Sequence, residues 1–319
     1  MATALIDLAA ARLGGRALKA SDEFFAPKAN LLQPGRGVFI EGKYTDRGKW
    51  MDGWETRRRR GPPDHDWCII QLGTPGVIRK VTVDTNHFRG NHPEAASLEA
   101  ATGATDAWVE VLPRMPLAGH TENVFPVKTE VRATRVRLNI YPDGGVARLR
   151  VWGEPRPDWT RLRAGKKPID LAAATLGGVP VAASDQFFSE PLNLILPGRP
   201  SDMGDGWETR RRRGPGFDWV VLKLAHRGVI AAAEVDTTHF KGNYPESCRL
   251  EGAESVAVPP PDDATWKELL PRTRLGPNRR HRFPVPVAAR RPVTHVRLSI
   301  FPDGGVARLR LWGRPVPAE

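Results

Sequence analysis

The chain has 319 residues, of which 40% are hydrophobic and 26% are charged, a composition typical of a water-soluble globular protein. No segment approaches the ~20 consecutive apolar residues of a membrane-spanning helix, and two cysteines, Cys68 and Cys248, argue against a disulfide framework or a cysteine metal site. The 48 Lys and Arg against 36 Asp and Glu give a net charge of +12, which favours anionic partners.

The first segment of the chain lacks the features of a secretory signal peptide, because Asp7 and Arg12 interrupt its apolar residues. A low cysteine content suits a reducing compartment. We therefore expect a cytoplasmic protein that does not bind membranes.

The predicted elements begin with a short helix in DLAAARLGG, with Asp7 as its N-cap and Gly14 and Gly15 at its end. Strands follow in WCIIQL (67–72), VIRKVTVDT (77–85), RVRLNI (135–140) and ARLRVW (147–152), and apolar residues alternate with polar ones in the last two. YPDGG between the last two strands is a turn motif, since proline fixes one backbone dihedral and glycine accepts positive φ.

All of these elements occur twice. The recurring blocks are DLAAARLGG and DLAAATLGG, SDEFF and SDQFF, DGWETRRRRGP in identical form from Asp52 and Asp205, VDTNHFRGNHPE and VDTTHFKGNYPE, and IYPDGGVARLRVWG and IFPDGGVARLRLWG. A period of about 150–160 residues is the size of a domain. We predict two homologous domains, residues 1–156 and 157–319, joined through a linker in 154–168.

The two copies differ by two insertions, GVFIEGKYTDRGKWM before the first DGWE and ESVAVPPPDD in the second copy, which we expect in surface loops. Many short strands separated by turns predict an all-β fold, with a β-sandwich or jelly roll in each half.

The blocks SDEFF, DGWETRRRR, VDTxHFxGNxPE and PDGGVARLRxWG resemble those of the allantoicase (allantoate amidinohydrolase) family over nearly the whole chain. The resemblance implies two tandem jelly rolls of the galactose-binding-like type. It also implies a hydrolase that converts allantoate to ureidoglycolate and urea in purine and allantoin degradation.

Allantoate carries a carboxylate and two ureido arms on one carbon, and a guanidinium binds a carboxylate through two parallel hydrogen bonds. In an extended segment Arg57 and Arg59 point one way and Arg58 and Arg60 the other. We expect the first pair, with Arg210 and Arg212 in the second copy, to bind the substrate carboxylate. Surface arginines that protect an edge strand are the structural alternative.

The ureido arms require donors and acceptors, and urea departure requires an acid and a positioned water. Asn91 and Asn243 are expected to bind the arms, with Trp54 and Trp207 as further substrate contacts. We expect His87 or His239 to donate the proton and Glu94 or Glu246 to orient water or a ureido arm. Glu55 and Glu208 are reserves, expected to have a lowered pKa beside the arginines.

Asp84, His87, His92 and Glu94 have metal-binding chemistry, but their spacing fits no zinc motif, so we expect neither a metal nor another cofactor. Two alternative functions are a non-catalytic carbohydrate-binding jelly roll and a nucleic-acid-binding protein. The carboxylates interleaved with the arginines argue against nucleic acid. Tandem copies are compatible with one site or two and with a homo-oligomer.

Overall fold

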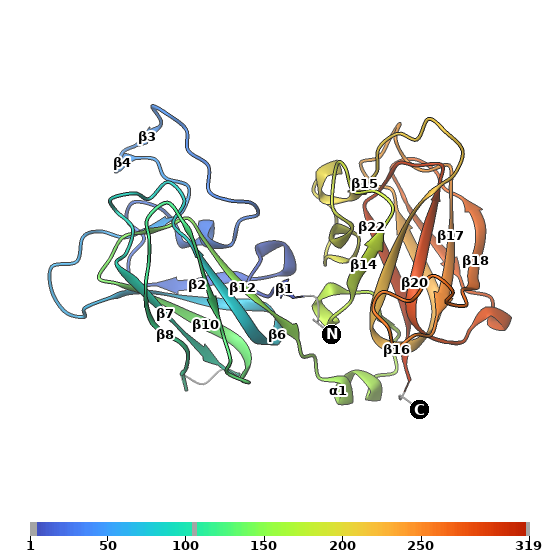
Figure 1. Cartoon of the computed structure of the whole chain (residues 1–319), viewed down its shortest axis with the longest axis horizontal. Coiled ribbons are helices and arrows are strands. Elements are labelled where there is room, and N and C mark those ends of the chain that lie inside the picture. Colours follow the sequence, from blue (N-terminus) through green and yellow to red (C-terminus); the bar gives the residue numbers. More distant parts are fainter. Residues whose placement is uncertain (1–4, 104–106, 317–319) are drawn as a thin grey trace. The chain divides into compact units, whose positions relative to one another are not determined.

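The computed structural model describes residues 5–103 and 107–316. It divides into two compact units, with the boundary between Pro157 and Asp158, and each unit is built from antiparallel strands (Figure 1). The all-β architecture in two tandem copies confirms the predicted fold class. Among the described residues, no helix has the length and apolar character needed to cross a membrane.

Apart from the hairpin β3–β4, which only the first unit has, the strands of the two units correspond in order and length. In the first unit they are β1 (Ile6–Asp7), β2 (Arg16–Ala20), β3 (Tyr44–Thr45), β4 (Gly48–Lys49), β5 (Trp54–Glu55), β6 (Asp66–Asp84), β7 (Ala95–Ala101), β8 (Val109–Pro116), β9 (Glu122–Pro126), β10 (Arg132–Tyr141), β11 (Gly145–Val146) and β12 (Arg148–Pro155). In the second unit they are β13 (Ile169–Asp170), β14 (Val179–Ala183), β15 (Trp207–Glu208), β16 (Asp218–Asp236), β17 (Ser247–Ala253), β18 (Lys267–Arg274), β19 (Arg280–Pro284), β20 (Pro292–Phe301), β21 (Gly305–Val306) and β22 (Arg308–Pro315).

The long strand β6 organises the first unit. Its first part pairs with β2 and β10, and its second part pairs with β9 and β12. The remaining strands extend these pairings to β7 and β8 on one side and β1 on the other. The sequence predicted two strands here, and the structure joins them into one strand whose pairing with β10 shifts register between Ala133 and Arg135. Strand β16 has the same role in the second unit.

Alternating residues of β6 and β10 form the core. Cys68, Ile70, Val136, Leu138 and Ile140 have no solvent-exposed surface, as expected for the inward face of strands with a period of two. Removing this apolar surface from water is the main stabilising contribution in each unit.

The expected N-terminal helix is a single 3-10 turn, η1 (Ala11–Leu13). Asp7 is not its N-cap, because its carboxylate accepts hydrogen bonds from the backbone N–H groups of Ala9 (3.1 Å) and Val151 (2.9 Å). The equivalent turn in the second unit is η3 (Ala174–Leu176). The only α-helix among the described residues is α1 (Trp159–Ala164), which lies within the expected linker.

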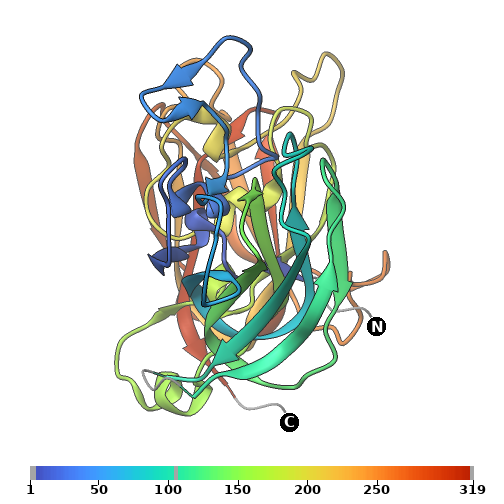
Figure 2. The ribbon, with the colours of Figure 1, turned by 90° about the vertical axis from the view of Figure 1, so that its left-hand side faces the viewer.

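Both insertions lie in loops. The first forms the hairpin β3–β4, which projects from one end of the first unit in two views (Figures 1 and 2). The second, between β17 and β18, has no regular structure over most of its length, and Val256 within it is 95% exposed. The second unit replaces the hairpin with the short turn η5 (Met203–Asp205).

Further 3-10 turns complete the described elements: η2 (Lys28–Leu32), η4 (Pro191–Ile195) and η6 (Val287–Ala289). The loops that carry the recurring polar blocks connect the strands at one end of each unit, and they form the candidate site described next.

Candidate active site

Alternate arginines of each run are neutralised by acidic residues of the same unit. The backbone N–H and Nε of Arg57 donate to Asp22 at 3.1 and 2.7 Å. The guanidinium of Arg59 pairs with buried Asp66, and its backbone N–H donates to Asp143 at 2.7 Å. In the second unit the corresponding contacts are Arg210 with Asp185 and Arg212 with Asp218 and Asp303.

The pKa of Asp22 is shifted in the direction that favours its ion pair with Arg57. Partial burial by itself would raise its pKa, but the hydrogen bonds from the Phe24 backbone N–H and from Arg57 outweigh burial and lower the pKa. The same balance lowers the pKa of Asp185, where Arg210 and Phe187 are the donors. These carboxylates are therefore ionised partners of the arginines at neutral pH.

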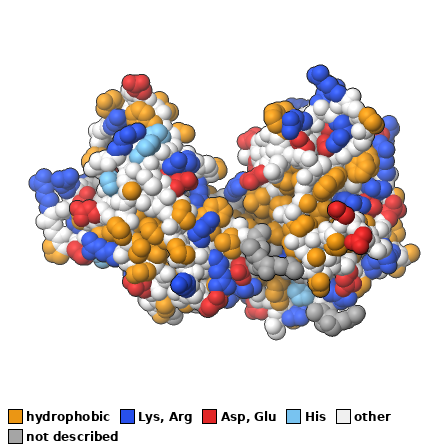
Figure 3. Space-filling view, in the orientation of Figure 1, with side chains coloured by type: hydrophobic (Ala, Val, Ile, Leu, Met, Phe, Trp, Pro, Cys, Tyr) orange, Lys and Arg blue, Asp and Glu red, His pale blue; other side chains and the backbone are white. Residues whose placement is uncertain are grey.

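The intervening arginines are free to bind a ligand. Arg58, Arg60, Arg211 and Arg213 are exposed, and none of them pairs with another residue in the described part of the chain. On the face of the molecule drawn in Figure 3, Lys and Arg side chains are interspersed with Asp and Glu.

A polar pocket of about 760 Å³ lies beside the run in the second unit. It has the size of a small-ligand site, and it collects side chains from several of the recurring blocks. Its lining residues are Phe188, Glu208, Thr209, Arg211, Arg212, Gly242, Asn243, Tyr244, Glu246, Arg274, Leu275, Pro302, Asp303 and Gly304.

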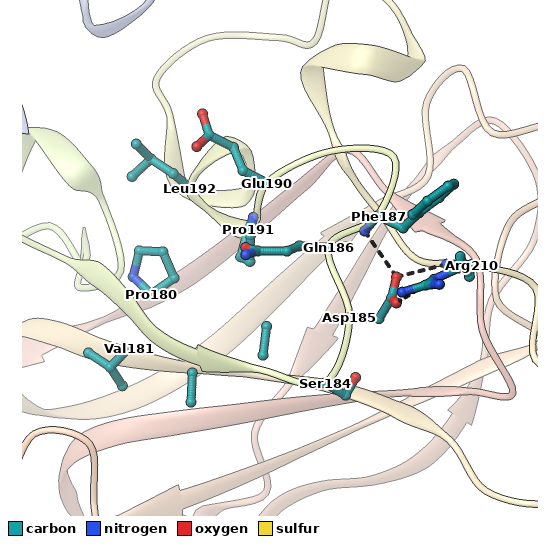
Figure 4. Close-up of a pocket in the computed structure, with 12 residues that line it drawn as sticks. Pro180, Val181, Ser184, Asp185, Gln186, Phe187, Glu190, Pro191, Leu192 and Arg210 are labelled. Atoms are coloured by element: carbon teal, nitrogen blue, oxygen red, sulfur yellow. Dashed lines mark hydrogen bonds and ion pairs between the residues drawn. The ribbon is translucent and has the colours of Figure 1, made fainter.

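Arg210 lies outside this pocket. It lines a separate pocket of about 570 Å³ in the same unit, where Asp185 accepts hydrogen bonds from Arg210 and from the backbone of Phe187 (Figure 4). Of the arginines expected to bind substrate in this unit, only Arg212 lines the larger pocket. Arg211, which the sequence placed on the opposite face, lines it as well.

A carboxyl–amide pair forms the centre of the site in both units. Nδ2 of Asn243 donates to Oε1 of Glu208 at 2.6 Å, and Nδ2 of Asn91 donates to Oε1 of Glu55 at 2.7 Å. The structure thus brings together the asparagine and the glutamate that the sequence expected separately.

The pKa of Glu55 is shifted in the direction opposite to our expectation. Burial raises the pKa of the Glu55 carboxyl, and the hydrogen bond from Asn91 offsets only part of this effect. The expected lowering by neighbouring arginines is wrong, because Arg57 and Arg59 direct their charge to Asp22 and Asp66. A carboxyl group of this kind retains its proton to higher pH.

The turn that follows β10 holds the pair in place. The backbone N–H of Gly145 donates to the carbonyl oxygen of Asn91 at 2.8 Å. The backbone N–H of Thr56 donates to the carbonyl oxygen of Gly144 at 3.1 Å. Gly145 is required here, since a Cβ at this position would lie 2.0 Å from the ring of Phe88.

Trp54 and Trp207 present no surface to a ligand in this structure, contrary to the sequence-based expectation of substrate contacts. Both have no exposed surface, and their indole N–H groups donate to the carbonyl oxygens of Asp22 (2.8 Å) and Asp185 (2.9 Å). They therefore pack the core beneath the site, and they offer no stacking surface to the sugar of the carbohydrate-binding alternative.

The expected proton donors lie in strained turns. His87 and His239 have positive φ values of 67° and 73°, a conformation that is uncommon for residues other than glycine. Nε2 of His239 lies 3.1 Å from the carbonyl oxygen of Pro200, and His239 is absent from the described residues that line the pocket. The ring of His87 lies 5.4 Å from that of His120.

Glu246 lines the pocket, whereas the candidate metal ligands are dispersed. Asp84 is paired with Arg36 at 2.9 Å, and within residues 5–103 and 107–316 no three His, Cys, Asp or Glu side chains are grouped as a metal site would require. Hydrolysis without a metal stays a prediction.

The acidic partners alternate along the run, but consecutive arginines, Arg211 and Arg212, line the same pocket. Asp22 and Asp185 recur in the SDEFF and SDQFF blocks, and they were the available signal that Arg57 and Arg210 already have acidic partners. Arg274 was missed because it lies in a strand, β18, outside the recurring blocks.

Comparison with known proteins identifies the family of this chain. A family model described as the allantoicase repeat matches residues 6–156 and again residues 169–316. The chain belongs to the allantoicase family. A probable allantoicase of Pseudomonas aeruginosa (strain UCBPP-PA14) is 52% identical over 321 residues, which cover 97% of this chain and 96% of the relative. Probable allantoicase 1 of Burkholderia mallei is 50% identical over 320 residues, covering 97% and 94%.

A solved structure of the same family supports the fold. The crystal structure of allantoicase from Saccharomyces cerevisiae matches with a TM-score of 0.81 and 36% identity, covering 97% of this chain and 93% of that one. Family membership and the tandem β-sandwich fold are thus established together.

Proposed function

We propose that this chain hydrolyses allantoate to ureidoglycolate and urea, and that the site containing the glutamate–asparagine pair binds the substrate. Membership of the allantoicase family supports the reaction. The observation that supports the location is an unpaired arginine beside a hydrogen-bonded carboxyl–amide pair in one polar pocket, Arg211 beside Glu208 and Asn243.

The substrate carboxylate binds to Arg58 in the first unit and to Arg211 in the second. The guanidinium groups of Arg57, Arg59 and their counterparts already form ion pairs with acids of the same unit. Arg58 and Arg211 are exposed and keep their planar donor groups available, which suits bidentate binding of a carboxylate.

The carboxyl–amide pair binds the ureido arm that leaves. Asn91 supplies a carbonyl acceptor for the ureido N–H groups, and Glu55, whose raised pKa favours the protonated form, donates a proton to the departing nitrogen. This assigns to Glu55 the acid role that the sequence gave to His87. The remaining ureido nitrogen supplies electron density to the central carbon as the C–N bond breaks.

Water then adds to the central carbon, which becomes the hydroxyl-bearing carbon of ureidoglycolate. Glu94 and Glu246 orient this water or the remaining arm in the proposed mechanism. The position of Glu246 in the lining of the pocket supports this role, and Glu94 is its counterpart in the first unit. Holding the reacting groups close together accounts for much of the acceleration that such a site provides.

Urea release from allantoate by the purified protein tests this proposal. The double variant Arg58→Ala with Arg211→Ala should lose on the order of 2–5 kcal/mol of substrate binding or transition-state stabilisation. The matched control is Arg57→Ala with Arg210→Ala, which removes neighbouring arginines of the same runs.

Equal losses in the two double variants would contradict the assignment of the carboxylate to Arg58 and Arg211. A wild-type protein that releases no urea would contradict the proposed reaction itself.

A further inference from the structure

The two units do not offer the substrate the same chemistry. Twelve of the fourteen residues that line the pocket of the second unit have the same residue type at the equivalent position of the first unit. The two exceptions are Tyr244, which corresponds to His92, and Arg274, which corresponds to Pro116. The two pockets can therefore be compared directly, because only these two lining positions differ in residue type between the units.

His92 is held with one ring nitrogen available. Its Nδ1 lies 2.9 Å from the carbonyl oxygen of Arg89. Because a carbonyl oxygen only accepts hydrogen bonds, Nδ1 carries the hydrogen and Nε2 is left as an acceptor. The neighbouring residue Asn91 donates to Glu55, so the imidazole belongs to the loop that builds the carboxyl–amide pair.

The space for this ring is a specific feature of the first unit. A Cβ on Gly119 would lie 2.6 Å from Nδ1 of His92 and 2.8 Å from the carbonyl oxygen of Arg89, so a larger residue would displace the contact that fixes the ring. The equivalent residue in the second unit is Pro277. Glycine is thus present where the imidazole is present.

The second unit has no imidazole at the position of His92. A phenol such as that of Tyr244 is a donor at neutral pH and accepts no proton from water. Glu246 accepts hydrogen bonds from Ser247 (2.6 Å) and Arg272 (3.0 Å), which lower its pKa, and Arg274 lies 3.5 Å away. In the first unit Ala95 and Pro116 take the places of Ser247 and Arg274.

We propose that turnover takes place in the first unit, where Nε2 of His92 accepts the proton of the attacking water. This inference rests on the proposed function and names a further residue for it. The bond from the central carbon to one ureido nitrogen breaks, with electron density from the other ureido nitrogen, and the proton of Glu55 goes to the leaving nitrogen. The water oxygen then bonds to that carbon, and one water proton passes to Nε2 of His92.

The step is balanced without any additional reactant. One water is consumed, one urea is released, and the proton on His92 returns to Glu55 through solvent before the next cycle. The second unit lacks the acceptor, so its pocket binds the anion without an equivalent path for the proton.

Kinetics of His92→Gln in the full chain tests the proposal. Glutamine can still donate to the Arg89 carbonyl oxygen but accepts no proton, so kcat should fall about 10²–10⁴-fold while KM changes little. Thermal unfolding of each variant checks that it is folded.

Tyr244→Phe is the matched variant at the equivalent position of the second unit, and its loss of kcat should be at least tenfold smaller. A His92→Gln protein with near-normal kcat would overturn the assignment, and so would equal losses in the two variants. Gly119→Ala gives a second readout, because displacing the ring should lower kcat without removing the imidazole. Absence of urea release by the wild type would instead overturn the proposed function, which keeps the two failures distinct.

Discussion

Two of the four consecutive arginines in each run are structural residues. Arg57 and Arg59 pair with Asp22 and Asp66, which reduces the repulsion that the run would otherwise produce. The alternating residues remain available for a ligand. The same run therefore anchors the loop to the unit and presents free positive charge at the site.

The two anchoring pairs should differ in their contribution to stability. Asp66 is 1% exposed, whereas the side chain of Arg57 is 64% exposed. Arg59→Ala leaves a buried carboxylate without its charged partner, which typically costs 3–5 kcal/mol. Arg57→Ala removes an exposed pair worth less than about 1 kcal/mol. Chemical unfolding of both variants measures the difference, and equal free energies of unfolding would contradict this account.

Glu55 should make stability depend on pH. Because its folded-state pKa is raised, the folded chain binds the proton more tightly than the unfolded chain, and stability decreases as pH rises from the unfolded pKa through the folded pKa. Glu55→Gln removes the titration and keeps an acceptor for Asn91. The variant should gain stability relative to the wild type between acidic and neutral pH. Unfolding free energies measured across this range test it, and a pH-independent difference would refute the argument.

At the scale of elements, an aspartate fixes the loop before DGWE in each unit. Asp52 has this role in the first unit and Asp205 in the second. The backbone N–H of Val38 donates to Asp52 at 2.9 Å, and that of Ser201 donates to Asp205 at 3.1 Å. Arg148 and Arg308 bind the same carboxylates at 2.7 Å. The same aspartate–arginine contact therefore fixes the loop that contains the hairpin β3–β4 and the shorter loop of the second unit, which has no hairpin.

Replacing residues 37–51, which include β3 and β4, with the sequence PSDMG of the second unit should preserve the fold. The hairpin itself exposes large apolar side chains, with Ile40 46% and Tyr44 69% exposed, so its removal loses little burial. The main loss is Met51, which is buried with Phe88 and Ala147 and is replaced by the glycine that precedes the second anchor, a change that costs about 2–5 kcal/mol. We expect the melting temperature to fall while the transition stays cooperative. Circular dichroism during heating measures it, and loss of the cooperative transition would show that the hairpin is part of the core.

At the scale of the whole molecule, the sequence predicted what repeats and what alternates. The recurring sequence blocks predict the duplication, and the alternation of apolar and polar residues predicts the buried faces of β10 and β12. The burial of Trp54 did not, since tryptophan suits a core and a cleft equally well. The raised pKa of Glu55 also required the structure, because the sequence shows that arginines are near but not which carboxylate each one faces.

The two units should fold independently when separated at the Pro157–Asp158 boundary. Each has its own long central strand and its own core, and chains of this length bury enough surface to be stable alone. The boundary keeps α1 with the second unit, where the ring of Trp159 lies 4.6 Å from that of His226. Fragments 1–157 and 158–319 should therefore each unfold in one cooperative transition.

The fragment 169–319, which lacks α1, provides the control for this boundary. Losing an aromatic pair of this kind should cost about 0.5–1.5 kcal/mol beyond the area it buries, so 169–319 should unfold at a lower denaturant concentration than 158–319. Identical midpoints would mean that α1 serves only as a connection. A broad, non-cooperative transition in 1–157 or 158–319 would mean that the cores depend on each other, and the duplication would then describe one folding unit instead of two.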